Sequence, residues 1–354
     1  MKKIGILTSG GDCPGLNCVI RAVVSHAILT YDWEVWGIPY ATKGLLERKA
    51  IPLNFQNFSV HGIDPLLSLG GTILGSINKG DTLDRSDEII AGYQELGLEA
   101  LIVIGGDGSL AILNHLAQKG NWKLVAIPKT IDNDIAITEK ALGFDSAVNT
   151  ITDSLNRLIC TAASHDRVMV VEVMGRSVGH LALHSGISGG ADVILIPEIP
   201  YSIAAICEKI TKLRQERDRK FAIVVVAEGV TTENGKPSTY TDSLGQKRLR
   251  GISQYIAEQV SHWSPNSLET RVTILGHVQR GGLPSAFDRV MAAAFGKTAV
   301  DLLAKEQYDR MVAWQNGQPV SVPLKDVLQQ SPRSVNPDGY LVQTARSLGI
   351  YIGE

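Results

Sequence analysis

The sequence is poor in cysteine and has no cysteine pattern that marks a metal site or a disulfide framework. Only four cysteines occur among 354 residues, and none belongs to a C-x-x-C pair: Cys13, Cys18, Cys160 and Cys207. Sparse, unpatterned thiols are typical of a reduced cytosolic protein. We therefore expect a cytoplasmic protein without a cysteine-bound metal. Cys13 lies in a glycine loop, and we interpret it as a space-filling residue, with a reactive thiol as the alternative.

Long apolar runs and an excess of basic charge are also missing. No apolar stretch reaches the roughly 18 residues of a membrane-spanning helix, and the formal net charge is −2. Proteins that bind nucleic acid or membrane surfaces usually carry a strong basic excess, so we expect neither partner. The apolar stretch at 4–7 is too short for a signal peptide, and the glycine turn that follows interrupts it. We interpret it as a first strand.

The sequence does contain a recurring order of apolar strand, glycine-rich turn and amphipathic helix. Strands are predicted at 4–7, 101–104, 124–127, 168–173, 222–226 and 272–275, and long helices at about 15–29 and 146–161. This alternation predicts an α/β protein with mostly parallel sheets, and the chain length favours two domains. The stretch at 231–245 is predicted to be a loop, and 308–354 is expected to be less regular.

Two short segments, 104–109 and 128–134, follow apolar strands directly. Ligands of open α/β sheets bind at the carboxyl ends of such strands. These segments place acidic side chains there: Asp107, Asp132 and Asp134. Packing gives no reason for them, because a buried, unpaired carboxylate costs several kcal/mol.

Glycine turns at helix starts favour phosphate, because they offer free backbone N–H groups and the positive end of the helix dipole. The sequence has two such turns, at 10–12 and at 105–109. A carboxylate beside a phosphate is repulsive unless a divalent cation lies between them, so Asp107 indicates Mg²⁺. The alternative is that Asp107 caps its helix. Gly108 leaves room close to the backbone.

The segment Thr130–Asp134 allows a catalytic and a structural interpretation. One carboxylate could accept a proton from a hydroxyl while the other helps to place the metal. In a loose phosphoryl-transfer transition state, the proton acceptor needs position more than basicity. The alternative is an ordinary Asp/Asn turn.

Basic side chains close to strand ends complete the pattern, and they are Arg167, Arg176, Arg271, His277 and Arg280. Arginine binds phosphate through two parallel hydrogen bonds, so this set is suited to a sugar phosphate. Glu228 could accept hydrogen bonds from sugar hydroxyls. Taken singly, each of these residues is more often part of a surface ion pair.

The chain resembles the bacterial-type ATP-dependent 6-phosphofructokinases. The match runs from Ile4 to about Leu303 and rests on these segments: Thr8–Asp12 with Pro14–Asn17, Gly70–Thr72, Gly105–Ser109, Thr130–Asp134, Val171–Arg176 and Gly276–Gly282. It implies transfer of a phosphoryl group from ATP to the 1-hydroxyl of fructose 6-phosphate, a glycolytic step, with Mg²⁺ as cofactor.

The resemblance also implies a role for each matching residue. Asp132 is the expected base, and Asp107 the expected Mg²⁺ ligand. The nucleotide is expected to contact Gly11, Gly106, Asp107, Gly108 and Ser109. The sugar phosphate is expected to contact Thr130, Met174, Gly175, Arg176, Glu228, His277 and Arg280, joined by Arg167 and Arg271 from a neighbouring subunit.

The architecture that the resemblance implies has two Rossmann-like domains with the active site in the cleft between them. The expected ATP-binding domain comprises 1–143 and about 279–334, and the expected sugar-phosphate-binding domain 144–278 and about 335–354. The resemblance also implies an allosteric enzyme and an oligomer with active sites shared between subunits, which we expect to be a homotetramer.

Three positions depart from the family pattern. Lys129 stands where classical ATP-using members have glycine, and pyrophosphate-using members usually pair this lysine with an aspartate at the position of Gly108. Gly108 favours a nucleotide, and we predict ATP, with pyrophosphate or ADP as the alternative donor. Asn78 stands near the place of a bridging arginine, for which Lys79 could substitute.

The regulatory pattern of the family is only partly present. Matching residues are Arg21, Asp192, Arg217 and Arg219, whereas Ser25 and Ile159 replace basic residues. Fewer cations bind phosphorylated effectors more weakly, so we expect a reduced response to ADP and phosphoenolpyruvate.

Two other classes of function agree less well with the sequence. A lipid or NAD kinase would share the Gly-Gly-Asp-Gly loop but not the segments at 130–134 and 276–282. A non-catalytic sugar-sensing module would bind sugar without turnover, and it needs no paired carboxylates beside a phosphate loop.

Overall fold

The structure is a computed structural model that describes residues 2–56, 64–77, 82–217, 219–241, 247–249, 251–263 and 269–353. The chain divides into two compact units. Unit 1 comprises Met1–Ser146 and Arg280–Arg333, and unit 2 comprises Ala147–Gln279 and Ser334–Glu354. The family-based domain limits lie within a few residues of these boundaries. None of the described helices is long and apolar enough to cross a membrane.

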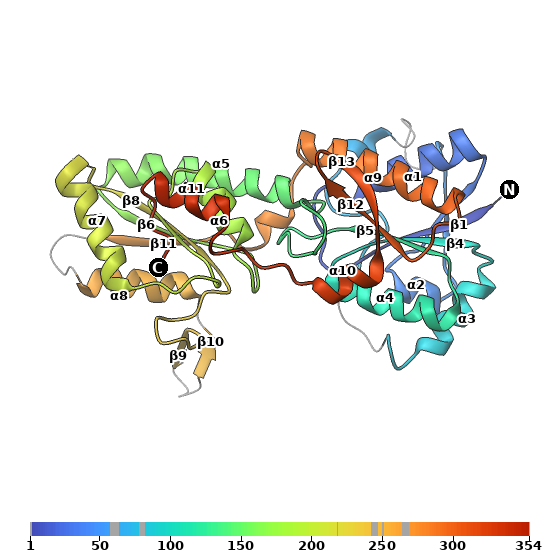
Figure 1. The fold of residues 1–354 in the computed structure, drawn as a ribbon, viewed down its shortest axis with the longest axis horizontal. Coiled ribbons are helices and arrows are strands. Elements are labelled where there is room, and N and C mark those ends of the chain that lie inside the picture. The colour runs from blue at the N-terminus through green and yellow to red at the C-terminus, as the bar shows by residue number, and fades with distance from the viewer. Residues whose placement is uncertain are drawn as a thin grey trace. The chain divides into compact units, whose positions relative to one another are not determined.

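Unit 1 is built on a seven-stranded sheet (Figure 1). Its strands are β1 (Lys3–Ser9), β2 (Glu34–Gly37), β3 (Ile51–Leu53), β4 (Ala100–Gly105), β5 (Leu124–Pro128), β12 (Arg310–Gln315) and β13 (Gln318–Pro323). They lie in the order β13-β12-β5-β4-β1-β2-β3, and only the two edge strands are antiparallel to their neighbours.

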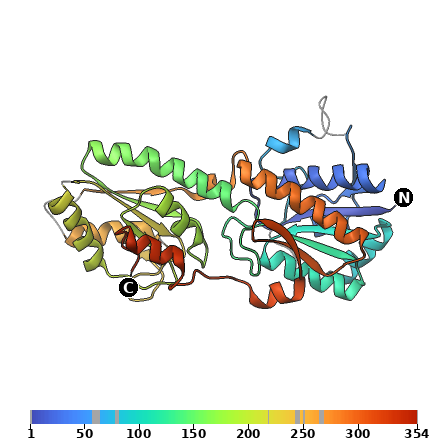
Figure 2. The ribbon, with the colours of Figure 1, turned by 45° about the horizontal axis from the view of Figure 1, so that its top comes forward.

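Helices cover both faces of this sheet, as Figures 1 and 2 show. One face packs against α1 (Leu16–Tyr31) and α9 (Ala286–Ala304). The other packs against α2 (Thr42–Leu46), α3 (Ser86–Glu95), α4 (Asp107–Gly120) and α10 (Leu324–Gln330), and a short 3-10 helix, η1 (Asp64–Ser68), contacts α1. Coverage on both sides explains why β4 and β5 are apolar along their whole length and buried.

Unit 2 has a smaller, fully parallel sheet of four strands. The strands β6 (Val168–Val173), β7 (Val193–Leu195), β8 (Ala222–Ala227) and β11 (Thr270–Ile274) lie in the order β11-β6-β8-β7. Its helices are α6 (His180–Ser188), α7 (Ile203–Arg217), α8 (Ile252–Trp263) and α11 (Tyr340–Ser347). The boundary between the units falls within α5 (Phe144–Ser164), and the 3-10 helix η2 (Gly276–Arg280) also spans it. The predicted parallel α/β architecture is confirmed.

The expectation of an irregular segment at 308–354 was wrong. This segment forms the hairpin β12–β13 and the helices α10 and α11. Asn316 and Gly317 connect the two strands with φ values of 51° and 76°, and two left-handed residues match the twist of a tight hairpin. The Asn-Gly pair was the sequence signal for this hairpin.

The predicted loop at 231–245 contains a strand. Residues Thr239–Thr241 form β9, which pairs antiparallel with β10 (Lys247–Leu249). Residues 242–246 lie outside the described part of the chain. The turn-forming composition of the segment concealed a strand of only three residues.

A buried aspartate fixes the start of α9. Asp288 is fully buried and accepts hydrogen bonds from the N–H groups of Gly143 (3.0 Å) and Ser146 (2.9 Å). The Ser146 hydroxyl donates a further bond at 2.5 Å. Burial raises the pKa of Asp288, and these donors oppose the shift. The side chain thereby fixes the loop before α5 against α9.

Asp288→Ala is expected to destabilise the protein by about 3 kcal/mol, because it leaves three buried donors without an acceptor. Thermal unfolding followed by circular dichroism measures the loss. Asp84→Ala removes an exposed aspartate and should leave the midpoint within about 1 °C. Equal midpoints for the two variants would contradict the role given to Asp288.

Candidate active site

The carboxyl ends of three neighbouring strands carry the candidate site in unit 1. Ser9 at the end of β1 is paired with Gly105 at the end of β4, and Gly105 with Pro128 at the end of β5. The segments that follow these strands therefore begin side by side. β2 lies on one side of β1, and β4 and β5 lie on the other. Such a switch in strand order is where open α/β sheets bind ligands.

Two basic side chains hold the turn after β1. Lys129 Nζ donates a hydrogen bond to the Gly11 carbonyl, and Arg280 Nη1 donates one to the Asp12 carbonyl at 3.2 Å. A Cβ atom on Gly11 would lie 2.5 Å from Arg280 Nη1. The absence of a side chain at Gly11 therefore lets the guanidinium pack against the backbone.

The loop after β4 leads directly into α4. Gly106 is the N-cap residue, and no side chain caps this helix, so the capping alternative for Asp107 was wrong. Asp107 is half-buried in the first turn, where the helix dipole favours negative charge. Ser9 Oγ donates a hydrogen bond to Ser109 Oγ at 3.2 Å, which joins the end of β1 to the start of α4.

Gly108 borders open space. It is exposed, and apart from its chain neighbours and the backbone of its own helix, a Cβ atom at this position would meet no heavy atom of the described residues within 4 Å. No packing contact within the described chain therefore requires glycine here.

The segment after β5 is a bend centred on Asn133, whose φ is 54°. The Asn133 side chain accepts a hydrogen bond from the Ala141 N–H at 2.8 Å and donates one to the Glu139 carbonyl at 3.1 Å. Asn133 therefore stabilises the bend, as the alternative of an ordinary Asp/Asn turn predicts. Asn133 has left-handed backbone angles and separates Asp132 from Asp134. The two aspartates therefore do not lie on one face of an extended strand.

The two aspartates of this bend have different surroundings. They are 8% and 7% exposed, respectively. The Asp132 N–H donates to Thr130 Oγ1 at 3.1 Å, which orders the residues before the carboxylate. The Asp134 carbonyl accepts a hydrogen bond from the Arg333 N–H at 2.6 Å. Burial lowers the pKa of Arg333, and the charge of Asp134 opposes this shift. Asp134 thus interacts with Arg333 through its carbonyl group and through its charge.

Lys129 is 4% exposed. Burial lowers the pKa of its ammonium group, and nearby acidic groups, among them Asp12 and Asp132, oppose the shift. Its backbone N–H donates to the Gly105 carbonyl at 2.9 Å. Lys129 therefore contacts the turn after β1 through its side chain and the end of β4 through its backbone.

A pocket of about 300 Å³ adjoins the turn after β1. Its lining combines apolar, hydroxyl and charged groups: Thr42, Lys43, Leu46, Glu47, Ile77, Thr82 and Arg85. Ile77 connects the pocket to the turn, because its carbonyl accepts a hydrogen bond from the Gly10 N–H at 3.1 Å.

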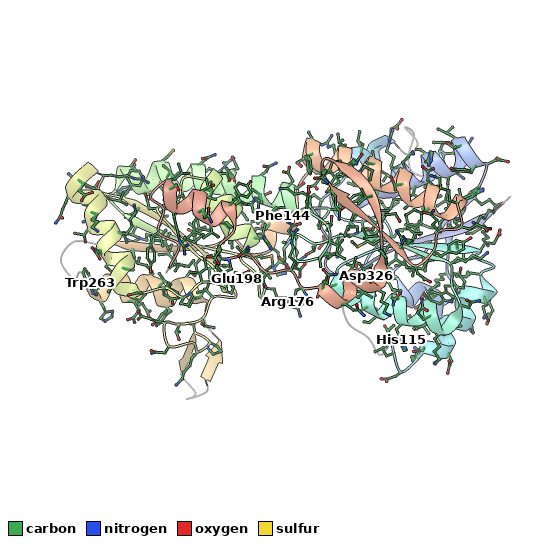
Figure 3. All side chains as sticks on the ribbon, in the orientation of Figure 1. His115, Phe144, Arg176, Glu198, Trp263 and Asp326 are labelled. Carbon is green, nitrogen blue, oxygen red and sulfur yellow. The ribbon has the colours of Figure 1, made fainter. Side chains whose placement is uncertain are left out.

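In unit 2, two glutamates hold the turn that carries Arg176. Arg176 has a φ of 45°, and its N–H donates to Glu228 Oε1 at 3.0 Å. Glu198 Oε1 accepts hydrogen bonds from the N–H groups of Gly179 (3.0 Å) and Val335 (2.9 Å). Figure 3 shows Arg176 and Glu198 at the same end of the unit 2 sheet. One oxygen of Glu228 is therefore already used to support the backbone.

Gln279 connects the end of β6 to the loop that carries His277. The buried Gln279 side chain accepts from the Met174 N–H at 3.0 Å and donates to the Gly276 carbonyl at 2.9 Å. Met174 and Gly175 follow β6, His277 follows β11, and its side chain is exposed. The structure thus brings these predicted residues together in unit 2, while Thr130 and Arg280 belong to unit 1.

Arg167 and Arg271 lie at the opposite end of the unit 2 sheet. Arg167 precedes β6, and Arg271 is the second residue of β11. Both contact Glu269, Arg167 at a distance of 3.1 Å. A six-residue strand is roughly 16 Å long, so these arginines do not join Arg176 and His277 within one chain.

Residues that sequence reasoning missed act through backbone contacts, and they are Ser76, Glu198, Gln279 and Arg333. Each binds a segment far away in the sequence, and no local pattern marks such a pairing. Asn78, Lys79 and the side chain of Arg217 lie outside the described residues.

Three of the residues matched to the regulatory pattern form ion pairs, and they are Arg21, Asp192 and Arg219. Arg21 contacts Asp64 at 2.6 Å, and Arg219 contacts Asp192 at 2.9 Å. The Arg219 guanidinium also lies over the ring of Phe221, 4.2 Å from its centroid.

Comparison with known proteins identifies the family. The sequence model of the family named phosphofructokinase matches residues 3–303. The chain belongs to the phosphofructokinase family. Two curated phosphofructokinases are similar over its full length, and both are named ATP-dependent 6-phosphofructokinase. The protein of Trichormus variabilis is 66% identical, and the alignment covers 99% of its length. The protein of Thermosynechococcus vestitus is 60% identical, and the alignment covers 93% of its length.

Solved phosphofructokinases share the fold. The T-state enzyme of Pichia pastoris aligns with 98% of this chain at a TM-score of 0.82 and 31% identity, and this chain spans 36% of that longer one. The pyrophosphate-dependent phosphofructokinase of Nitrosospira multiformis aligns over the whole chain at a TM-score of 0.83. At 19% identity, that likeness concerns the fold alone.

The two glycines of this site are expected to respond differently to alanine. Gly108→Ala should keep or raise the unfolding midpoint, because its methyl group meets open space and alanine stabilises a helix by up to about 1 kcal/mol. Gly11→Ala should lower it, since displacing Arg280 removes a hydrogen bond of about 1 kcal/mol. Differential scanning calorimetry measures both. A lower midpoint for Gly108→Ala than for Gly11→Ala would contradict the described geometry.

Proposed function

We propose that this phosphofructokinase is an ATP-dependent 6-phosphofructokinase of glycolysis. It transfers the terminal phosphoryl group of ATP to the 1-hydroxyl of fructose 6-phosphate and yields fructose 1,6-bisphosphate and ADP. The observation that carries the proposal is the alignment of the glycine turn, Asp107 and Asp132 at the ends of β1, β4 and β5. The names of relatives as much as 66% identical over the whole chain support it.

The nucleotide phosphates bind at the ends of β1 and β4. Gly11, Gly106, Gly108 and Ser109 line this position. Glycine permits close approach of a phosphate to the backbone, and the start of α4 adds the positive end of a helix dipole. The pocket beside Ile77 is the proposed position of the adenine ring.

Mg²⁺ is suited to this site as a companion of the nucleotide. No group of three potential metal-binding side chains exists among the described residues, so the described chain does not enclose a metal by itself. Mg²⁺ commonly takes one or two carboxylates and fills its shell with waters and phosphate oxygens. Asp107, at the start of α4, is the residue that would hold it. When bound, the ion neutralises charge on the phosphates.

Asp132 is the proposed base. Its carboxylate follows β5 beside the phosphate-binding loops and accepts the proton of the sugar 1-hydroxyl as the phosphoryl group is transferred. The Thr130 hydroxyl accepts the Asp132 N–H and thereby positions the base. Little proton transfer is needed early in a loose transition state, so an aspartate of ordinary basicity is sufficient.

The ligands of the sugar phosphate are proposed from the family pattern. In unit 2 these are Met174, Gly175, Arg176, Glu228 and His277, and in unit 1 Thr130 and Arg280. The guanidinium groups bind phosphate oxygens. Glu228 supports the turn of Arg176 with Oε1, so its other oxygen is the proposed acceptor for a sugar hydroxyl.

ATP is favoured over pyrophosphate as the donor by the surroundings of Gly108. The open space beside Gly108 accommodates the part of a nucleotide beyond its terminal phosphates, and the pocket beside Ile77 adds a place for a base. Pyrophosphate uses neither feature.

The proposed assembly is an allosteric homotetramer in the cytoplasm. Arg167 and Arg271 lie at the end of the unit 2 sheet away from Arg176, which favours their use in the active site of a neighbouring subunit. A reduced response to ADP and phosphoenolpyruvate is proposed, because the ion pairs of Arg21 and Arg219 compete with effector phosphates.

Initial rates on fructose 6-phosphate with ATP, ADP and pyrophosphate, measured in parallel through formation of the bisphosphate, test the proposed function. We expect the highest kcat/KM with ATP. Asp132→Asn should lower kcat with ATP by about 10²–10⁴-fold with little change in KM for the sugar. Asp326→Asn, an exposed aspartate on α10, serves as the matched control.

Three outcomes would contradict the proposal. Higher kcat/KM with pyrophosphate or ADP would reject ATP as the donor. Sugar binding without turnover would identify a sugar-sensing module. A near-normal kcat in Asp132→Asn would remove Asp132 from its role as base.

A further inference from the structure

Three consecutive carbonyl groups of the turn after β1 are each bound by a side chain from a distant part of the chain. The Ser76 hydroxyl donates to the Gly10 carbonyl. Lys129 Nζ donates to the Gly11 carbonyl, and Arg280 Nη1 donates to the Asp12 carbonyl. We refer to Ser76, Lys129 and Arg280 as the carbonyl clasp.

The clasp fixes the direction of the N–H groups that follow these carbonyls. In a trans peptide the C=O and the next N–H point in opposite directions. The N–H groups of Gly11, Asp12 and Cys13 therefore point away from the clasp. None of the three has a hydrogen-bond partner within the described residues. A run of oriented, unpartnered N–H groups is an anion-binding arrangement.

Lys129 has a special place in the clasp. Its ammonium group is the one that fixes the central peptide, between Gly11 and Asp12. It is 4% exposed, so it is enclosed by protein. Its own backbone N–H is bound to the Gly105 carbonyl at 2.9 Å. One residue thus ties the turn after β1 to the end of β4.

We propose that Lys129 is a positioning residue that holds the Gly11–Asp12 peptide so that the Asp12 N–H faces the donor phosphates. Its ammonium group acts through the Gly11 carbonyl and does not contact a phosphate. This inference rests on the proposed function, because it concerns the same nucleotide site. It also means that Lys129 does not determine which phosphoryl donor is used, the role that its resemblance to pyrophosphate-using members suggests.

A double-mutant cycle with Ser76→Ala and Lys129→Met tests the inference. The affinity for ADP is measured by isothermal titration calorimetry on the complete protein without sugar, so that no turnover is needed. Each single variant should bind ADP about tenfold more weakly, because each releases one bond of the clasp. The double variant should be scarcely weaker than the weaker single variant, because both residues act on one turn.

Multiplicative losses in the double variant would overturn the positioning role, because an independent contact of Lys129 with a phosphate predicts them. Unchanged affinity in Lys129→Met would overturn it as well. A wild-type protein that binds no ADP would instead contradict the proposed function, and the inference with it. The matched control is Lys123→Met, an exposed lysine just before β5, which should bind ADP like the wild type.

A ligand-free crystal structure of Lys129→Met provides a readout that a contact with the donor would not change. The Gly11–Asp12 peptide should be rotated relative to the wild type, and an unchanged peptide orientation would overturn the inference. If the methionine variant does not fold, Lys129→Gln replaces it in both experiments, since it keeps a donor on a shorter stem that does not reach the carbonyl.

Discussion

The parallel pairing of β1, β4 and β5 is the constraint on which the site depends. Ser9, Gly105 and Pro128 are the paired ends of these strands, so the three segments that follow them begin in one row. Slipping one strand by a single residue would exchange its two faces. The strands are buried on both sides, and their register therefore fixes the chemistry at their ends.

The glycine turn after β1 depends in turn on partners from distant segments. Ser76, Lys129 and Arg280 bind its carbonyls, and Ser9 at the end of β1 is hydrogen-bonded to Ser109 in the first turn of α4. Glycine gives this backbone its freedom, and the clasp restricts that freedom to one arrangement. A preorganised set of N–H groups lowers the cost of binding an anion.

Much of the fold and the site was predictable from sequence, because the signals are local. Apolar runs followed by glycine turns predicted β1, β4 and β5, and the acidic residues after them marked the candidate site. The contacts of Ser76 and Glu198 were not predictable, because each joins segments that only the fold brings together. The hairpin β12–β13 was missed although Asn316 and Gly317 carry a local signal for it. The parallel α/β architecture is confirmed, while the roles of Asp107 and Asp132 stay predictions.

A crystal structure of the protein with ADP and Mg²⁺ is the most direct test of how these three strand ends act together. The diphosphate should lie about 3 Å from the N–H groups of the turn at Gly11–Cys13, with Mg²⁺ beside Asp107 and the adenine ring beside Ile77. A diphosphate bound away from the ends of β1 and β4 would contradict this arrangement.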